Sequence, residues 1–196
     1  EIKINDKYYN VILRNFLNKF YYDKDDLGVT FDKNRIRIKI WAPTAYRIQI
    51  CLYNYYNEHI DRPCEVHEMS FNSDSGVYDV ELNKINKNKY YLFKLYFKYR
   101  NDKEIDLKVK YAIDPYAKAV SVNGEKGVLL DINDKESKPK YWKNDKRPFI
   151  ENMEDTILYE MHIRDFTIDE NSGVSQRIRG KFLGAVQEGT FYIDKE

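Results

Sequence analysis

The segment Arg35–Trp41 alternates charged and apolar side chains without interruption, and this pattern restricts the fold more than any other feature of the sequence. Its period of two places Ile36, Ile38 and Ile40 on one face and cations on the other, as a strand with one buried face requires. The segment Arg47–Tyr53 repeats the alternation after a short proline turn. The two segments are therefore predicted to pair as antiparallel strands with one face in water.

Further short strands are predicted in the middle of the chain. Residues 77–82 alternate after a Ser-Asp-Ser-Gly turn, and residues 90–99 form the most aromatic stretch. A helix is expected only over residues 10–20, with a short turn at 115–120. Short strands separated by turn signals predict a mainly β fold, namely an immunoglobulin-like β-sandwich.

Composition and charge narrow the classes of partner. The 33 basic and 32 acidic residues give a formal net charge of +1, which offers no electrostatic case for nucleic-acid binding. Apolar runs extend over only a few residues, far short of the roughly 20 that a membrane span needs. We therefore expect neither a nucleic acid nor a membrane as a partner.

The cysteines and the first residue bear on cellular context. Cys51 and Cys64 form neither a disulfide framework nor a metal cluster, and as free thiols they favour a reducing compartment. A cytoplasmic location is thus preferred, while secretion stays open. The chain begins at Glu1 and its first methionine is Met69, which predicts an excised or processed piece of a longer protein.

The second part of the chain changes character. Residues 131–155 are polar and punctuated by proline, which is typical of an exposed connection. Residues 156–166 again have the pattern of a strand, with Glu160, His162 and Arg164 on one parity. A glycine-spaced loop follows. The sequence thus predicts a complete sandwich followed by the first strand of a second, incomplete domain.

A series of sequence blocks carries a resemblance to a known family. They are residues 22–30 (YDKDDLGVT), 40–45 (IWAPTA), 112–119 (AIDPYAKA) with 122–124 (VNG), 142–148 (WKNDKRP), 158–167 (LYEMHIRDFT) and 180–184 (GKFLG). In this order and spacing they resemble the type I pullulanases, debranching glycoside hydrolases of the α-amylase type. The resemblance extends over residues 21–190, nearly the whole chain.

The resemblance implies a glycogen-binding-type β-sandwich module ahead of a catalytic (β/α)₈ barrel. On this basis the chain divides into a lead segment at 1–20, the sandwich module at 21–130, the connection at 131–155 and the start of an incomplete catalytic barrel at 156–196. A lone barrel strand has unpaired edges, so we expect it to be disordered, to pair with the sandwich edge or to pair between molecules.

The resemblance also implies a function. The family hydrolyses α-1,6-glucosidic branch points in pullulan, starch and glycogen, so the expected partner is an α-glucan polysaccharide. Its retaining mechanism needs two carboxylates about 5–5.5 Å apart, and the family's catalytic motifs are absent from this sequence. No residue here inherits a catalytic role, and the chain as given is expected to be inactive. We expect no cofactor in this chain, while calcium in the parent enzyme stays open.

Candidate substrate-binding residues come from both parts of the chain. Arg164 and Asp165 lie nearest the C-terminal end of the predicted barrel strand, where a substrate would bind. Glu160 and His162 are better explained, together with Arg164, as a satisfied polar layer inside the barrel. No metal ligands are expected. The three aspartates between residues 23 and 26 lack the spacing of a calcium loop, and the histidines near Cys64 lack a fourth zinc ligand.

In the sandwich the candidates are aromatic. Tyr90 and Tyr96 share the parity of the lysines of their strand and are expected to be exposed, which suits stacking on glucose rings. Trp41 ends a strand before a turn and is expected to cap the core, with sugar stacking as the alternative. Trp142 is expected to pack the module against the barrel, or to contact glycan.

Three functions stay open on the sequence alone. The first is the N-terminal portion of a pullulanase-type hydrolase. The second is a stand-alone α-glucan-binding module, which the aromatic-rich sandwich indicates. The third is a purely structural immunoglobulin-like domain, which explains the alternation but not the block at residues 158–167.

Overall fold

The computed structural model describes residues 2–9, 13–100 and 105–190, and the chain divides into two compact units, Glu1–Trp142 and Lys143–Glu196. Every strand of the described residues lies in the first unit. No helix in the described ranges is both long enough and apolar enough to cross a membrane.

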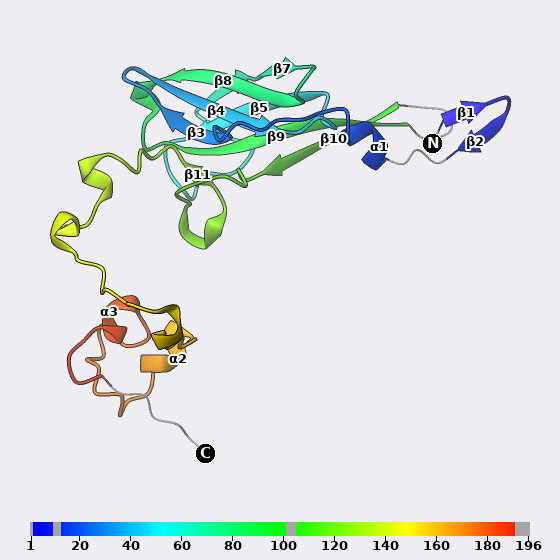
Figure 1. Cartoon of the computed structure of the whole chain (residues 1–196). Helices are drawn as coiled ribbons and strands as arrows, with labels where there is room; N and C mark the ends of the chain where they lie inside the picture. The colour runs from blue at the N-terminus through cyan, green and yellow to red at the C-terminus, as the bar shows by residue number, and fades with distance from the viewer. Residues whose placement is uncertain (1, 10–12, 101–104, 191–196) are drawn as a thin grey trace. The chain divides into compact units, whose positions relative to one another are not determined.

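The first unit is built on two antiparallel sheets that form a sandwich (Figure 1). One sheet has the order β3-β4-β8-β7 and the other the order β10-β9-β5-β6, with β11 added to β9. The mainly β, sandwich-like fold predicted from the sequence is thereby confirmed. The bounds are β3 Gly28–Phe31, β4 Arg35–Trp41, β7 Ser70–Asn72 and β8 Val77–Asn83 in the first sheet, and β5 Arg47–Tyr53, β6 Glu65–Glu68, β9 Tyr90–Arg100, β10 Ile105–Ala112 and β11 Gly127–Val128 in the second.

The alternating apolar residues face inward as predicted. Ile36 and Ile38 of β4, Ile48 and Ile50 of β5, and Phe93 of β9 are fully buried in one core cluster between the sheets. Burying an apolar side chain of this size contributes about 1.5–3 kcal/mol relative to leaving it exposed. A shift of one residue in any strand would move its whole apolar set to the solvent face, so the alternation determines the orientation of each strand.

β4 and β5 do not pair with each other, so this part of the prediction is wrong. β4 pairs with β8 along its whole length, β5 pairs with β9, and the two strands lie in different sheets. The N–H of Ala42 donates to the carbonyl of Gly76 (3.0 Å), whereas the N–H of Tyr46 donates to the carbonyl of Tyr96 in the other sheet (3.0 Å). The chain crosses between the sheets within these few residues, because the two apolar faces can then cover each other.

The outer face of the β5–β9 pair is also less exposed than predicted. Cys51, Tyr53 and Leu92 are buried there in a second apolar cluster, against which Ile60 packs from the loop after β5. Burial raises the pKa of the Cys51 thiol. The end of β5 is apolar on both parities, and this is the sequence signal for a strand that is covered on both faces.

The segments around the sandwich are short. β1 Ile2–Ile4 and β2 Lys7–Tyr9 pair as a hairpin that the sequence patterns did not indicate. α1 Leu13–Leu17 lies within the helix predicted over residues 10–20, of which residues 10–12 lie outside the described residues. The turn predicted at 115–120 is closed by a hydrogen bond from the Ala117 N–H to the Asp114 carbonyl (3.1 Å).

In the second unit, the structure does not show the strand predicted over residues 156–166. Residues 156–162 form no regular element, α2 Ile163–Thr167 follows, and α3 Phe182–Ala185 is the next helix. A barrel strand is stabilised by neighbouring strands that accept and donate its backbone hydrogen bonds, and no ladder of the described residues includes this segment. The His162 imidazole instead accepts the N–H of Asp165 (3.4 Å) at the start of α2.

Candidate functional site

A depression of about 250 Å³ in the first unit is lined almost entirely by aromatic side chains. We call it the aromatic depression. Three separate segments build it: the lead into β3, the end of β4 and the loop after β10. Its lining residues are Phe20, Tyr21, Tyr22, Leu27, Trp41 and Tyr116.

The rings of the aromatic depression are accessible. Tyr21 is 76% exposed, Trp41 is 37% exposed, and Tyr116 is also exposed. Within the described ranges, no cation lies over any of these three rings. Trp41 therefore borders a surface depression rather than only capping the core as expected. Open aromatic faces with phenol and indole groups at their edges suit a ligand that is apolar on its face and polar at its rim.

Two features of the fold hold Tyr116 in place. Gly28 has a φ of +82°, and a Cβ built on it would lie 2.6 Å from the Cβ of Tyr116, so only glycine allows this approach. Asp114 is only 2% exposed; its carboxylate accepts the N–H of Tyr116 (2.8 Å) and the hydroxyl of Tyr91 (2.7 Å). Burial raises the pKa of Asp114. Gly127 in turn leaves room for the Tyr91 ring, since a Cβ there would lie 2.6 Å from it.

A polar cluster holds Tyr22 at the same depression. Lys39 of β4 donates to Asp26 Oδ2 (2.5 Å) and to the Tyr22 hydroxyl (2.9 Å), and Tyr22 donates to Asp26 Oδ1. Partial burial opposes ionisation of Asp26, but the hydrogen bonds from Lys39 and Tyr22 outweigh it and lower its pKa. Asp26 is therefore engaged in a salt bridge. In the described part of the chain no three acidic, histidine or cysteine side chains are grouped so that they could hold a metal ion.

Tyr96, a predicted stacking residue, is half-buried and covered rather than exposed. The Arg47 guanidinium lies 4.8 Å from its ring centroid and the Lys94 ammonium 5.7 Å. Its hydroxyl donates to Gln49 Oε1 (2.6 Å). Arg47, which is paired with Tyr96 across the β5–β9 ladder, and Lys94 of the same strand both contact the ring, because a cation over an aromatic face is attracted to it. The expectation that the Tyr96 ring is exposed is therefore wrong.

Tyr90, the other stacking candidate of β9, is also half-buried. It packs against the second apolar cluster, and the ring of Tyr56 meets it edge-on with centroids 6.4 Å apart. The expectation of an exposed ring at this position is wrong as well, and the substrate-binding role of Tyr90 and Tyr96 stays a prediction. The physical reason is the loop after β5, which covers this end of the outer sheet face.

The candidate residues of the second unit lie on its surface. Arg164 and Asp165 are in α2, exposed, and 3.4 Å apart at their charged groups. His162 lies 3.4 Å from Asp165, and Glu160 is exposed. The structure does not bring Glu160, His162 and Arg164 into a buried polar layer, because the strand that would align them is not formed. The substrate-binding role of Arg164 and Asp165 stays a prediction. Trp142, at the end of the first unit, is exposed.

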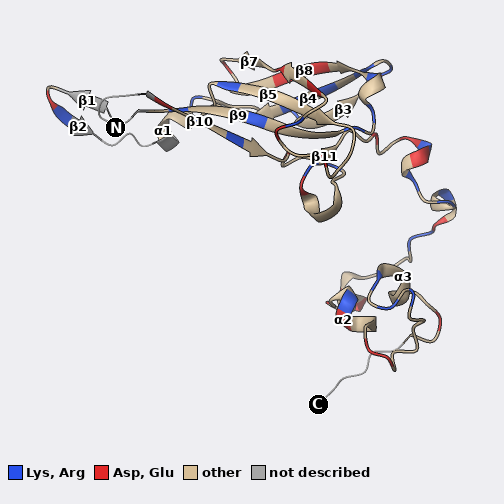
Figure 2. Ribbon diagram, turned by 180° about the vertical axis from the view of Figure 1, so that it is seen from behind, with Lys and Arg blue, Asp and Glu red and all other residues tan. Residues whose placement is uncertain are grey.

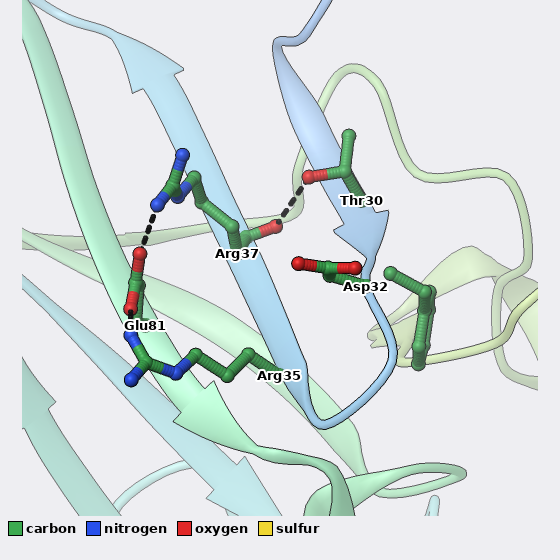
Figure 3. A pocket seen from close by; sticks show the side chains of 6 residues that line it. Thr30, Asp32, Arg35, Arg37 and Glu81 are labelled. Atoms are coloured by element: carbon green, nitrogen blue, oxygen red, sulfur yellow. Dashed lines mark hydrogen bonds and ion pairs between the residues drawn. The ribbon is translucent and has the colours of Figure 1, made fainter.

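A second pocket, of about 210 Å³, is polar and lies on the outer face of the β3-β4-β8-β7 sheet. Figure 3 shows Glu81 between Arg35 and Arg37. Arg37 donates a hydrogen bond to one carboxylate oxygen of Glu81, and Arg35 donates to the other (2.5 Å). Both hydrogen bonds lower the pKa of Glu81, and the one from Arg37 has the larger effect. With Asp32 on its wall the pocket balances two cations with two carboxylates, which leaves no net charge to attract an anion. Figure 2 shows the same mixture of basic and acidic positions on the sandwich strands.

Comparisons with known proteins agree with the fold. Residues 26–117 match carbohydrate-binding module 48 (isoamylase N-terminal domain), so the sandwich is a module of this class. This range contains Leu27, Trp41 and Tyr116, whereas Phe20, Tyr21 and Tyr22 lie outside it, N-terminal to its start.

The chain as a whole is homologous to pullulanases. It is 31% identical over 166 residues to pullulanase 1, chloroplastic, of Arabidopsis thaliana, covering 84% of this chain and 16% of the relative. It is 32% identical over 175 residues to the pullulanase of Bacillus subtilis (strain 168), covering 89% of this chain and 21% of the relative. A crystal structure of the Paenibacillus barengoltzii pullulanase with maltohexaose and α-cyclodextrin matches with a TM-score of 0.74 at 31% identity, over 92% of this chain and 25% of that one. The chain thus spans about a fifth of the length of the curated relatives.

The sequence did contain a signal for the aromatic depression. Three of the blocks that carry the pullulanase resemblance each contribute one lining ring: Tyr22 from 22–30, Trp41 from 40–45 and Tyr116 from 112–119. Their meeting in space could not be derived from periodicity, because more than 70 residues separate Trp41 from Tyr116.

Proposed function

We propose that this chain binds α-glucan through the aromatic depression and that it serves a pullulanase-type debranching enzyme. The observation that carries the proposal is the set of open rings of Tyr21, Trp41 and Tyr116, positioned from three segments of a family 48 sandwich. Maltooligosaccharides are the ligands named for the matching pullulanase structures, and their pyranose rings fit such a surface.

Within such an enzyme the module holds the polymer, and the chemistry belongs to a catalytic barrel. We assign no catalytic carboxylate pair to this chain, and we propose that it is inactive by itself. Residues 156–162 are proposed to become the first strand of that barrel, where neighbouring strands would satisfy its backbone groups. The enzyme would hydrolyse α-1,6-glucosidic bonds with retention, using two carboxylates about 5–5.5 Å apart.

Calorimetric titration with maltohexaose tests glucan binding by the 196-residue chain. The Trp41→Ala variant is expected to bind about ten- to a hundredfold more weakly, because burying an aromatic side chain against a ligand contributes about 1.5–3 kcal/mol. Trp142→Ala is the matched control, since Trp142 is an exposed tryptophan outside the depression, and it should bind as the wild type does. Absence of binding by the wild-type chain, or equal affinity of the Trp41→Ala variant, would contradict the proposal.

A stand-alone glucan-binding module is the second candidate, because the first unit contains both sheets and their own core. Release of reducing sugar from pullulan separates the enzymatic question from the binding question. The chain should release none, and activity of a preparation free of contaminating hydrolase would refute the assignment of the chemistry to a barrel outside this chain.

A further inference from the structure

β10 forms one edge of the second sheet, and it is the longest edge strand of the described residues. It has eight residues, whereas the edge strands β3, β6 and β7 have four, four and three. Its only ladder within the described ranges is with β9, and it runs along the margin of the sheet (Figure 1). The backbone groups on the other side of β10 can therefore accept a further strand.

The middle of β10 is uncovered on both of its faces. Leu107 is 56% exposed and Val109 is 43% exposed. Asp106 and Lys108, which alternate with them, are exposed as well. The end of β9 beside this stretch, residues 97–100, extends past the ladder that β9 makes with β5. β9 and β10 are a two-stranded ribbon here, and such a ribbon gains stability when a third strand joins it.

The charged residues of β10 restrict what that third strand can be. The ladder sets Asp106 opposite Tyr99 and Lys108 opposite Phe97, on the face of the sheet that packs against the core. The Lys108 ammonium lies 4.8 Å from the Tyr99 ring centroid, and within the described ranges neither Asp106 nor Lys108 has an ion-pair partner. Charges that point to this side of an edge strand normally prevent pairing with another strand. The exception is a strand that presents the opposite charge at each of these positions.

A second copy of β10 is such a strand in one register. A two-fold axis at Leu107 sets this residue opposite its own copy and sets Asp106 opposite Lys108 in both directions. The next pair is Ile105 with Val109, both apolar residue types. An axis one residue nearer the N-terminus sets Asp106 against itself, and an axis one or two residues nearer the C-terminus sets lysine against lysine. Opposite charges directly across a ladder are stabilising and like charges are destabilising, so the sequence selects the axis at Leu107.

We propose that β10 is a self-association surface, at which two copies of this chain pair antiparallel through residues 105–109 with a two-fold axis at Leu107. The pairing joins the two five-stranded sheets across the axis, and the open backbone groups of each edge are satisfied by the other. A contact of five residues per chain is small for a stable interface, so the dimer should form between about 10 µM and 1 mM. The proposal does not depend on glucan binding by the aromatic depression.

Sedimentation equilibrium of the full chain over this concentration range tests the pairing. Asp106→Lys and Lys108→Asp should each weaken self-association at least about tenfold, because like charges then face each other. A mixture of the two single variants should associate again, and so should the double variant Asp106→Lys/Lys108→Asp, because every pair is then opposite in charge once more. Lys33→Asp reverses another exposed lysine of the sandwich and is the matched control, expected to dimerise as the wild type does.

A cysteine at the two-fold axis locates the register. Cα atoms directly across an antiparallel ladder are about 4.5–5.5 Å apart, within the range of a disulfide. Leu107→Cys in a Cys64→Ser background should therefore become a covalent dimer when an oxidant is added. Val109→Cys in the same background is the matched control, because two copies of residue 109 would lie about 13–14 Å apart along the ladder and should not be linked.

Each outcome bears on the pairing alone. A wild-type chain that stays monomeric up to about 1 mM would overturn the proposal, and β10 would then be left for a different protein or for another part of a longer chain. Dimerisation that both charge reversals leave unchanged would place the contact elsewhere and would overturn it as well. Linkage of Val109→Cys but not of Leu107→Cys would overturn the axis at Leu107. The maltohexaose titration of Trp41→Ala is a separate measurement, so the failure of one proposal is distinguishable from the failure of the other.

Discussion

Replacement of Gly28 by alanine should both destabilise the sandwich and weaken glucan binding. Gly28 has a φ of +82°, in the left-handed region, where a Cβ costs about 1–2 kcal/mol. The new Cβ would also lie 2.6 Å from the Cβ of Tyr116 and 3.1 Å from its carbonyl oxygen, atoms that cannot turn away like a flexible side-chain end. The side-chain and backbone shifts that relieve such overpacking typically cost a further ~1–3 kcal/mol. The expected loss of stability is therefore about 2–5 kcal/mol.

Gly124→Ala is the matched control for this prediction. Gly124 also has a positive φ, +67°, but a Cβ there would meet nothing within 4 Å. This variant should lose only the backbone contribution of about 1–2 kcal/mol. Urea unfolding of both variants measures the difference, and maltohexaose titration of folded Gly28→Ala should show weakened binding because Tyr116 is displaced. Equal unfolding free energies for the two variants would refute the argument that Gly28 is required for the approach of Tyr116.

Two further predictions concern buried and half-buried polar groups. Tyr91→Phe removes the hydroxyl that donates to the buried Asp114 carboxylate (2.7 Å), and thermal unfolding should show a loss of stability of about 1–3 kcal/mol. The loss should exceed that of Tyr78→Phe, because the Tyr78 hydroxyl donates to the neutral carbonyl of Ala45 (2.7 Å). An equal or smaller loss for Tyr91→Phe would show that Asp114 does not depend on Tyr91. The hydrogen bond from Lys89, with that of His67, lowers the pKa of Glu65 below its ordinary 4.5, so the folded state is stabilised above that pH and the contribution is lost as the pH falls through the folded-state pKa. The Glu65→Gln variant should therefore be about 0.2–1 kcal/mol less stable than wild type at pH 7. In urea unfolding this difference should shrink as the pH falls through the folded-state pKa of Glu65, and a difference that grows on acidification would contradict the assignment.

In the second unit, a local sequence pattern did not determine the secondary structure. Residues 156–166 have the composition of a strand, but a strand exists only where another one accepts its hydrogen bonds, and the structure forms α2 from Ile163–Thr167 instead. The same dependence on partners explains the error about β4 and β5. Their alternation correctly indicated which side chains point inward, but alternation carries no information about which strand lies alongside.

The candidate binding surface, too, was only partly predictable from the sequence. Residue types alone favoured Tyr90 and Tyr96, because their parity on β9 points away from the core. Whether a ring on that face is open depends on its neighbours, and Arg47 from β5 and Tyr56 from the following loop cover these two. The position of Trp41 at a strand end predicts a ring that caps the core, and it does not reveal the depression that lies beside it.

By itself, the amino-acid sequence determined the sandwich, the inward face of its strands and the similarity to pullulanases. Periodicity and the order of motifs are local features of the linear sequence and do not depend on tertiary contacts. The tertiary structure alone decided which strands pair, which tyrosines stay uncovered and where Tyr22, Trp41 and Tyr116 meet. These depend on contacts between residues far apart in sequence, and the free energy of such contacts is settled only when the whole core is assembled.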